Sequence, residues 1–247
     1  MTNKKIKGVF FDLYGTLLTF NDFDGSDAIW VNSFYKLVGE PNGISYDTVQ
    51  QICRGILESD LEKNASTNLT TYETKIKTEF EKVGVNLTAD ELRKVADETI
   101  SIWQKEIHLA DDALLVLGEL KENCMIILIT NFDHSPHVKK LLERTGLQNY
   151  FDLVIISDEA GCKKPNPEIF NLALDRTRLK PEEVIYVGDN ILDDICGASS
   201  AGIRPVLISR GTKSNQIAKQ EQLNLENFNL PEHQIIKSLS ELIPFVN

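Results

Sequence analysis

The sequence predicts an α/β fold, in which an open, mostly parallel sheet flanked by helices is interrupted by an inserted α-helical domain. Two observations predict the sheet. Short apolar runs rich in β-branched and aromatic residues recur along the chain, as buried parallel strands do, and helical patterns lie between the later runs. A third observation predicts the insert, because the gap between Leu13, where the first run ends, and Met125, where the second begins, far exceeds a crossover connection.

The expected strands are, in chain order, 9–13, 125–130, 153–157, 184–187 and 206–209. A helix that includes Val138 and Leu142 follows the second strand, and a helix over 167–174 follows the third. Right-handed crossovers through these helices form an open sheet whose strand ends meet at one crevice. A short strand at 234–237 and a closing helix at 239–245 are expected at the end of the chain.

The gap between the first two strands contains helical patterns and no comparable strand signal. Apolar residues repeat at helical spacing in the stretches 31–38, 49–57 and 92–107. Thr70 with Glu73, and Thr88 with Glu91, have the spacing of capping boxes, which predicts two helix starts inside the insert. Three or four helices are therefore expected in this part of the chain.

The helical insert divides the chain into two expected domains. The sheet domain comprises residues 1–20 and 106–247, and the helical cap comprises residues 21–105. A chain of 247 residues is long enough for one large domain or for one domain that carries a sizeable insertion.

The charge and composition exclude several classes of function. With 26 Lys+Arg against 37 Asp+Glu the net charge is −11, which repels nucleic acid and anionic membranes, so neither is expected as a partner. No segment approaches the ~18 apolar residues of a membrane span, and the apolar run 8–11 is too short for a signal peptide. The 4 cysteines form no zinc or CxxC pattern. A cytoplasmic protein is expected.

Polar residues follow the first two expected strands at their carboxyl ends, where open α/β sheets bind ligands. Asp-Leu-Tyr-Gly-Thr, beginning at Asp12, closes the first strand, and Thr130-Asn131 closes the second. Asp12 either begins a Gly-containing turn or acts on a ligand. Thr130 is either a turn former or a ligand contact.

Basic and acidic residues follow the third and fourth expected strands. Lys163 and Lys164 precede a rigid Pro-x-Pro turn into a helix, where a fixed lysine suits an anion. The fourth strand runs into Gly-Asp-Asn-Ile-Leu-Asp-Asp, which contains Asp189 and Asp194. Because these carboxylates would repel Asp12, a hard divalent cation with oxygen ligands is expected between them. Mg²⁺ takes such carboxylates together with waters and a substrate phosphate.

Taken together and in this order, the four segments resemble the motif set of the haloacid dehalogenase superfamily: strand-DxxGT, strand-[ST]N, KPxPxIF and GDxxxxDxxGA. The resemblance covers the whole sheet domain. The cap matches in position and helical character, as in members with an insertion between the first and second motifs. The resemblance implies a Rossmann-like catalytic domain with a helical cap, and a hydrolase.

The resemblance also implies a role for each matching residue. Asp12 is implied to be the nucleophile that forms a transient aspartyl-phosphate, which water then hydrolyses. Thr130 is implied to bind a phosphoryl oxygen, and Lys164 to balance the charge on Asp12, which leaves Lys163 solvated. The further residues implied to line the phosphate site are Gly15, Thr16 and Asn131.

A Mg²⁺ site is implied by the same motifs. Its carboxylate ligands would be Asp12 and Asp189, with Asp194 acting directly or through a water. The backbone carbonyl of Tyr14 would complete the protein ligands. The expected substrate is a small phosphorylated molecule, and a two-fold homodimer is the base-rate expectation for assembly.

The sequence departs from most phosphatases of this superfamily two residues after the nucleophile. They have there a second Asp, which serves as general acid and then as base, whereas this chain has Tyr14. A phenol with a reference pKa of about 10 is a poor base at neutral pH, and such assistance is worth roughly 10²–10⁴ in rate. Slow turnover of unactivated esters is expected. Asp22 and Asp24, in the loop into the cap, are alternative acids.

Two other functions remain open. Asp-x-Tyr-Gly-Thr resembles the first motif of the metal-independent 2-haloacid dehalogenases, in which the nucleophile attacks carbon. Those enzymes lack the Gly188-Asp189 pair, and their cap arginine has a weak match here in Arg54, so the phosphatase is favoured. The third candidate is a catalytically weak module that binds a phosphorylated ligand or a protein partner.

Overall fold

The computed structural model describes residues 5–20, 26–61, 67–210 and 234–246. The chain folds into two compact units. The first, here called the sheet unit, comprises Met1–Thr19, Leu109–Asn131 and Leu142–Asn247. The second, the helical unit, comprises Phe20–His108 and Phe132–Leu141.

The sheet unit contains a six-stranded sheet in which every pairing is parallel. In spatial order the strands are β5 (Leu153–Ile156), β4 (Met125–Thr130), β1 (Gly8–Phe11), β6 (Val184–Gly188), β7 (Arg204–Ile208) and β8 (Ile235–Ile236). Each lies within two residues of an expected strand, because the apolar runs that predicted them are buried in the sheet. The predicted α/β fold class is confirmed.

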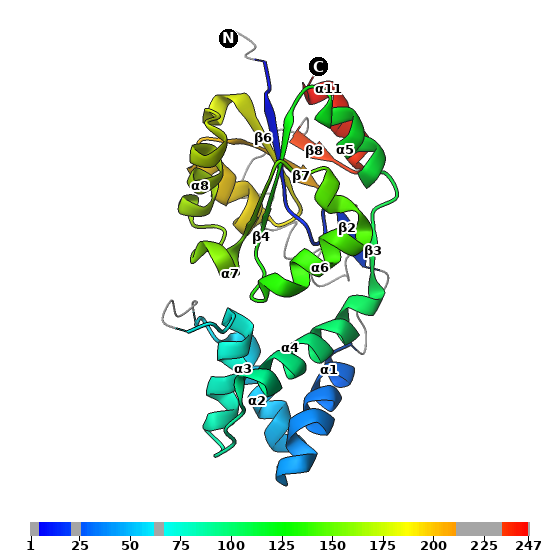
Figure 1. Cartoon of the computed structure of the whole chain (residues 1–247). Coiled ribbons are helices and arrows are strands. Elements are labelled where there is room, and N and C mark those ends of the chain that lie inside the picture. Colours follow the sequence, from blue (N-terminus) through cyan, green and yellow to red (C-terminus); the bar gives the residue numbers. More distant parts are fainter. Residues whose placement is uncertain (1–4, 21–25, 62–66, 211–233, 247) are drawn as a thin grey trace. The chain divides into compact units, whose positions relative to one another are not determined.

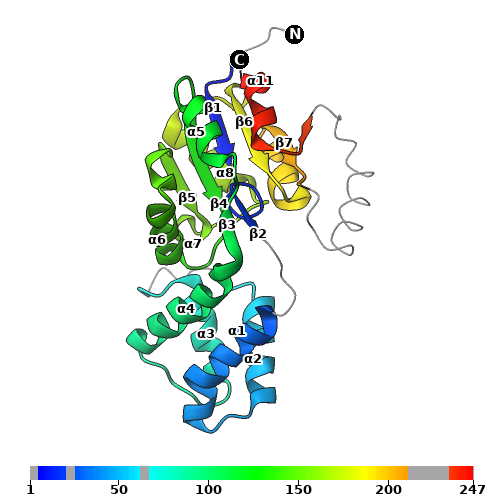
Figure 2. The same cartoon turned by 90° about the vertical axis from the view of Figure 1, so that its right-hand side faces the viewer.

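Helices cover both faces of this sheet (Figures 1 and 2). On one face α8 (Pro167–Thr177) packs Ile169 and Phe170 against Phe10. It begins at the predicted Pro-x-Pro turn, where the Asn166 side chain accepts the backbone N–H of Glu168. The opposite face carries α5 (Ala113–Lys121). Helix α6 (Ser135–Thr145) begins in the helical unit and ends in the sheet unit. The other helical segments of the sheet unit are η4 (Leu147–Asn149), α7 (Ser157–Ala160), η5 (Pro181–Glu183), η6 (Ile191–Cys196), α9 (Gly197–Ser200), η8 (Leu239–Leu242) and α11 (Ile243–Val246).

The helical unit is built around an apolar core. Its segments are α1 (Ser26–Phe34), η1 (Tyr35–Gly39), η2 (Glu40–Asn42), α2 (Tyr46–Glu58), α3 (Thr71–Glu81), α4 (Ala89–Trp103) and η3 (Gln104–Glu106). Phe34, Ile76 and Phe80 are fully buried in its core. Capping boxes begin α3 at Thr70 and α4 at Thr88, which confirms both predicted helix starts.

Two short strands connect the units. β2 (Leu18–Phe20) and β3 (Ile107–Leu109) pair as a separate two-stranded sheet, and the chain passes between the units within these strands. A second connection follows β4, since residues 132–141 belong to the helical unit. Within that unit His134 is buried and hydrogen-bonds the Thr70 hydroxyl at 2.9 Å.

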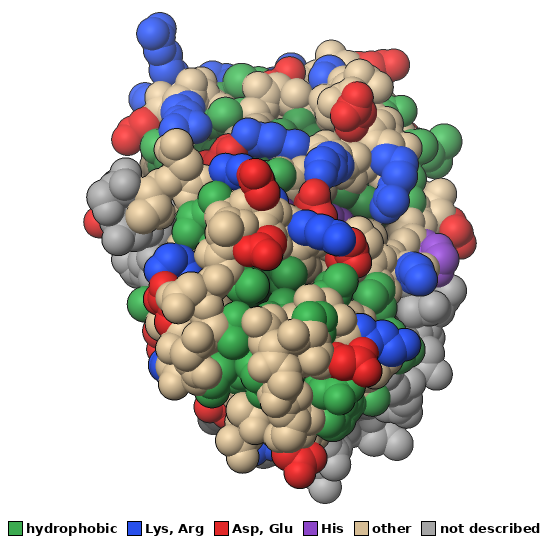
Figure 3. All heavy atoms as spheres, turned by 60° about the horizontal axis from the view of Figure 1, so that its bottom comes forward, with side chains coloured by type: hydrophobic (Ala, Val, Ile, Leu, Met, Phe, Trp, Pro, Cys, Tyr) green, Lys and Arg blue, Asp and Glu red, His purple; other side chains and the backbone are tan. Residues whose placement is uncertain are grey.

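The face shown in Figure 3 carries acidic and basic side chains side by side, although the chain as a whole has a net charge of −11. Among the described residues, no helix has both the length and the apolar character that crossing a bilayer demands.

Candidate active site

The carboxyl ends of the three central strands meet where the sequence places its polar motifs. β1 lies between β4 and β6, with Phe11 paired to Leu128 on one side and Val187 on the other. Asp12 follows β1 and donates its backbone N–H to the carbonyl of Val187 at 2.9 Å. It is therefore the neighbour of both Thr130 on β4 and the residues that follow β6.

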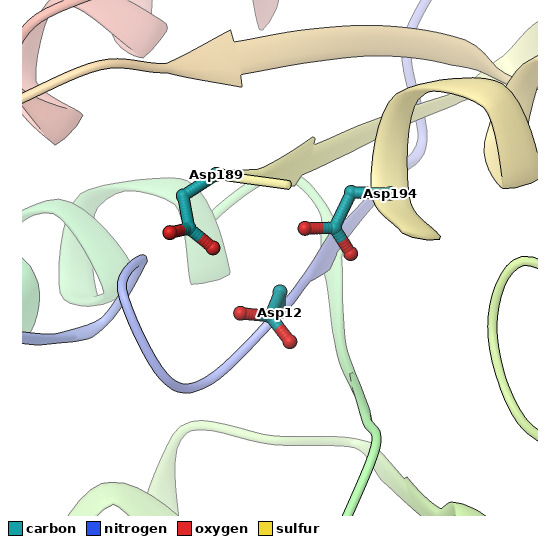
Figure 4. A group of neighbouring side chains, drawn as sticks. All are labelled: Asp12, Asp189 and Asp194. Atoms are coloured by element: carbon teal, nitrogen blue, oxygen red, sulfur yellow. The ribbon is translucent and has the colours of Figure 1, made fainter. Parts of the chain in front are cut away.

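Three carboxylates lie close together at this edge of the sheet (Figure 4). One oxygen each from Asp12, Asp189 and Asp194 lies within 4.8 Å of the other two. Asp189 follows β6 directly, and Asp194 comes from η6 and is buried. The adjacent Asp193 is half-buried and is not part of this cluster.

Two glycines allow the carboxylates to lie against the backbone. A Cβ added at Gly15 would lie 2.2 Å from Oδ2 of Asp189, and one added at Gly188 would lie 2.3 Å from Cγ of Asp194. Gly15 also has φ 87°, in the left-handed region that favours glycine. A methyl group at either position would displace an acid of the cluster.

Gly15→Ala is expected to weaken binding of Mg²⁺ about 10-fold or more, because the new methyl group displaces Asp189 from the cluster. The left-handed backbone adds a destabilisation of roughly 1–2 kcal/mol. Calorimetric titration with Mg²⁺ and thermal unfolding measure the two effects separately. Gly146→Ala is the matched control, since Gly146 has φ 75° and no heavy atom within 4 Å of the added Cβ. It should lose stability and keep the affinity, and equal Mg²⁺ affinity in both variants would contradict the prediction.

Lys164 contacts two of the three carboxylates. Its ammonium group donates to Oδ1 of Asp12 at 2.6 Å, to Oδ1 of Asp194 at 2.6 Å and to the hydroxyl of Tyr186 at 3.0 Å. The side chain is 3% exposed, whereas the preceding Lys163 is exposed to solvent. The structure therefore brings together four residues that the sequence singled out: Asp12, Lys164, Asp189 and Asp194.

The cluster contains more negative than positive charge, because three carboxylates lie close together and one ammonium group is hydrogen-bonded to two of them, Asp12 and Asp194. Burial raises the pKa of Asp12 to about 7; Lys164 opposes the rise, and the carboxylates of Asp194 and Asp189 add to it. Burial lowers the pKa of Lys164, but the neighbouring Asp12 and Asp194 outweigh it, so the net shift is upward. Lys164 is therefore charged at neutral pH, and Asp12 needs further positive charge to be fully ionised.

The donor set fits a hard divalent cation. Apart from the Lys164 ammonium group, the converging groups are carboxylate oxygens, which Mg²⁺ prefers, and such an ion neutralises the excess negative charge. Asp12, Asp189 and Asp194 are the residues that could bind it.

Two buried hydroxyl groups follow β1 and end β4. Thr16 and Thr130 are 0% and 1% exposed, and neither hydroxyl has a hydrogen-bond partner among the described residues. A buried hydroxyl without a partner is costly in an apolar surrounding. These groups fit the oxygens of an anion bound at the same edge of the sheet.

The side chain of Asn131 is hydrogen-bonded to the backbone of Lys164. Its Nδ2 donates to the Lys164 carbonyl at 2.9 Å, and its Oδ1 accepts the Lys164 backbone N–H at 2.9 Å. Nδ2 also lies 3.5 Å from Oδ2 of Asp193. This pair of bonds joins the end of β4 to the segment that carries the buried lysine.

Tyr14 and Arg54 are the remaining sequence candidates that the structure describes. Tyr14 is half-buried in the turn after Asp12; burial raises the pKa of its phenol further above 10, and the Asp12 charge adds to the rise. Arg54 is exposed on α2 of the helical unit. Asp22 and Asp24 lie outside the described residues.

Tyr186 is a member of the site that the sequence motifs did not indicate. It is fully buried on β6, and its hydroxyl donates to Oδ1 of Asp194 at 2.8 Å. Burial raises its pKa well above 10, as does the charge of Asp194, so the hydroxyl keeps its proton. The available signal was a tyrosine inside the otherwise aliphatic run Val-Ile-Tyr-Val, three residues before Asp189.

Comparison with known proteins identifies related sequences. A family model for haloacid dehalogenase-like hydrolases matches residues 6–202. N-acylneuraminate-9-phosphatase from Mus musculus is 28% identical over 245 residues, which cover 96% of this chain and 92% of that protein. Pyrimidine 5'-nucleotidase YjjG from Escherichia coli K12 is 31% identical over 198 residues, covering 79% of this chain and 82% of that protein.

Solved structures share the fold. A HAD phosphatase from Thermococcus onnurineus has a TM-score of 0.65 at 23% identity, with 98% of both chains covered. A 2-haloacid dehalogenase from Pseudomonas syringae has a TM-score of 0.64 at 21% identity, again with 98% of both chains covered. Since one structure is a phosphatase and the other a dehalogenase, this likeness describes the architecture and leaves the reaction to the residues of the site.

Proposed function

This chain belongs to the haloacid dehalogenase-like hydrolases, and we propose from that premise that it is a Mg²⁺-dependent phosphomonoester hydrolase acting on a small phosphorylated molecule. The observation that carries the proposal is the convergence of Asp12, Asp189 and Asp194, two of which, Asp12 and Asp194, are hydrogen-bonded to Lys164. A carboxylate at Asp189 beside the nucleophile is expected for a metal-assisted phosphoryl transfer. It would disfavour a departing halide anion. The sequence relatives named above are phosphatases.

The proposed reaction has two steps on Asp12. A carboxylate oxygen of Asp12 attacks phosphorus, the bond from phosphorus to the ester oxygen breaks, and the leaving alkoxide takes a proton from solvent water and departs as the alcohol. Water then attacks the phosphorus of the aspartyl-phosphate, releasing orthophosphate and restoring the carboxylate. Mg²⁺ held by Asp12, Asp189, Asp194 and the backbone carbonyl of Tyr14 would supply positive charge to the phosphoryl oxygens and favour ionised Asp12.

The other residues act by position and charge. Lys164 keeps a fixed positive charge 2.6 Å from Asp12, where negative charge accumulates as the phosphoryl group arrives. Thr130 and Thr16 offer buried hydroxyl groups to phosphoryl oxygens, and Gly15 leaves room beside Asp189. Asn131 makes two hydrogen bonds to the backbone of Lys164, and these fix the backbone position from which the lysine side chain extends.

The phenol of Tyr14 replaces the usual acid, so the leaving group must depart with little help. Tyr14→Asp is expected to raise kcat on alkyl phosphates by about 10–100-fold, while p-nitrophenyl phosphate, which has a stable leaving group, gains less than about 3-fold. Steady-state kinetics on the two substrate classes measure the difference. Tyr14→Asn has the size of aspartate without its proton, and it should give no gain on either class. An equal gain from both variants would show that the effect is steric.

The proposed function is tested with p-nitrophenyl phosphate. Hydrolysis that requires Mg²⁺ and stops in EDTA supports the phosphatase. Release of halide from 2-chloropropionate in EDTA, without phosphatase activity, would instead indicate a 2-haloacid dehalogenase, whose first motif Asp-Leu-Tyr-Gly-Thr resembles. A protein with neither activity would be a binding module.

The natural substrate is best sought among phosphorylated metabolites. A screen with Mg²⁺ should include an N-acylneuraminate 9-phosphate and pyrimidine 5'-nucleotides, because proteins named for these activities match 96% and 79% of the chain. Orthophosphate release is the readout. A substrate preference of at least about 10-fold in kcat/KM over p-nitrophenyl phosphate would identify the substrate class.

A further inference from the structure

The hydroxyl of Tyr186 lies between the lysine and one acid of the candidate site. It is 3.0 Å from Nζ of Lys164 and 2.8 Å from Oδ1 of Asp194. The ring is held by apolar packing, since it meets Phe170 edge to face with centroids 5.1 Å apart. The aromatic ring therefore belongs to the core beneath the sheet edge, and the hydroxyl belongs to the charged cluster.

Hydrogen-bond capacity assigns a direction to each contact. An ammonium group has three N–H donors and no acceptor, so Lys164 donates to Asp12, Asp194 and Tyr186. The Tyr186 hydroxyl accepts that bond and gives its own proton to Asp194, because the alternative acceptor, the Ile129 carbonyl, is farther away at 3.4 Å. All three donors of Lys164 are thereby used.

Asp194 is held at both of its oxygens. Oδ1 accepts from Lys164 and Tyr186, and Oδ2 accepts the backbone N–H of Asn190 at 2.9 Å. Without the tyrosine hydroxyl, one N–H of a 3%-exposed ammonium group would lose its acceptor and Oδ1 would lose one of its two donors. Both groups would then have more freedom to turn away from Asp12.

We propose that Tyr186 is a positioning residue for phosphoryl transfer, whose hydroxyl fixes the Lys164 ammonium group against Asp12 and keeps the Asp194 carboxylate turned into the cluster. It acts through these two residues and does not contact the phosphoryl group. The inference rests on the proposed function and extends it to a residue outside the four motifs.

The decisive variant is Tyr186→Phe, which removes one oxygen and keeps the ring on Phe170. The expected result is a fall in kcat of about 10-fold with KM for p-nitrophenyl phosphate within about 2-fold, the size expected for one hydrogen bond to charged groups. Calorimetric titration of metal-free protein should show Mg²⁺ binding weakened about 5-fold or more, since Asp194 is less well oriented. This second readout does not depend on turnover.

Thr177→Val is the matched control, because it also removes one hydroxyl from the sheet unit. That hydroxyl donates to the Ala173 carbonyl at 2.8 Å, within α8 and outside the cluster. The control should lose a few degrees of melting temperature and keep both kcat and Mg²⁺ affinity. A Tyr186→Phe variant that likewise changes only its melting temperature would overturn the proposal.

The wild-type protein tests the geometry by itself, whether or not the variant folds. An ammonium group donating to three buried acceptors exchanges its protons slowly, so a protected Lys164 signal is expected in ¹⁵N-resolved spectra of metal-free protein. Its absence would overturn the positioning role. If the wild-type protein binds Mg²⁺ and hydrolyses phosphate esters, and Tyr186→Phe has the same affinity and kcat, this inference alone is contradicted. If the wild-type protein neither binds Mg²⁺ nor hydrolyses phosphate esters, the proposed function is contradicted as well.

Discussion

Asparagine in place of Asp12 is expected to abolish phosphate-ester hydrolysis, lowering kcat by at least about 10⁴-fold. The neutral amide oxygen is a poor nucleophile and forms no stable acyl-phosphate, so the first step of the proposed reaction is lost. Orthophosphate release from p-nitrophenyl phosphate at saturating Mg²⁺ measures the effect. Activity above about 1% of wild type would contradict the assignment of Asp12 as the nucleophile.

The same variant should separate catalysis from stability. Asp12 is one of three neighbouring carboxylates, and its replacement removes repulsion with Asp189 and Asp194. The melting temperature of Asp12→Asn in EDTA should therefore equal or exceed that of wild type. A fall of more than about 5 °C would show that the loss of activity reflects unfolding.

Asp193→Asn is the matched control for this experiment. Asp193 precedes Asp194 in the same turn and carries the same charge, but the structure leaves it outside the carboxylate cluster. Activity within a few-fold of wild type is expected. If Asp193→Asn were as damaging as Asp12→Asn, the second acid of the last motif would have been assigned to the wrong residue.

Lys164→Met is expected to be the most destabilising single change at the site. Removing the ammonium group leaves Asp12 and Asp194 buried without their cation, and breaking a buried ion pair in this way costs about 3–5 kcal/mol. Hydrolysis should fall by at least about 10³-fold, since the positive charge beside the transferring group is lost. Thermal unfolding in EDTA and steady-state kinetics measure the two losses.

Mg²⁺ should restore part of that stability, because it replaces some of the missing positive charge. An ion present at 100 times its dissociation constant stabilises the folded state by about 2.7 kcal/mol. Lys163→Met provides the control, as Lys163 is exposed and should tolerate the change with kcat and melting temperature nearly unaltered. Equal destabilisation by both substitutions would contradict the placement of Lys164 between Asp12 and Asp194.

The sheet could be predicted because its central strands are buried on both faces. Runs such as Met125–Thr130 and Val184–Gly188 are apolar at consecutive positions, which identifies parallel strands without knowledge of their order. The proximity of Asp12 and Asp189 could also be predicted, because both follow such strands and the carboxyl ends of parallel strands lie at one edge of the sheet.

Other features of the site depend on geometry that a motif does not contain. Tyr186 points its hydroxyl at Lys164 because strand alternation places it on the face covered by α8, and a tyrosine inside a strand is ordinarily read as core. The role of Asn131 depends on the backbone path before Pro165, which brings Lys164 within two hydrogen bonds of the end of β4. The motif predicts Asn131 at the phosphate site but does not contain this backbone path.

The central place of β1 in the sheet has a consequence for synthesis on the ribosome. Both strands that pair with β1, namely β4 and β6, are translated after residues 20–108 of the helical unit. At roughly 5–20 residues per second, about 6–23 s pass between synthesis of Gly8–Phe11 and the start of β4 synthesis. During that time an apolar strand with two open edges is exposed to chaperones and to other nascent chains. Slower translation of the insert should therefore increase aggregation during expression more than substitutions that destabilise the folded protein do.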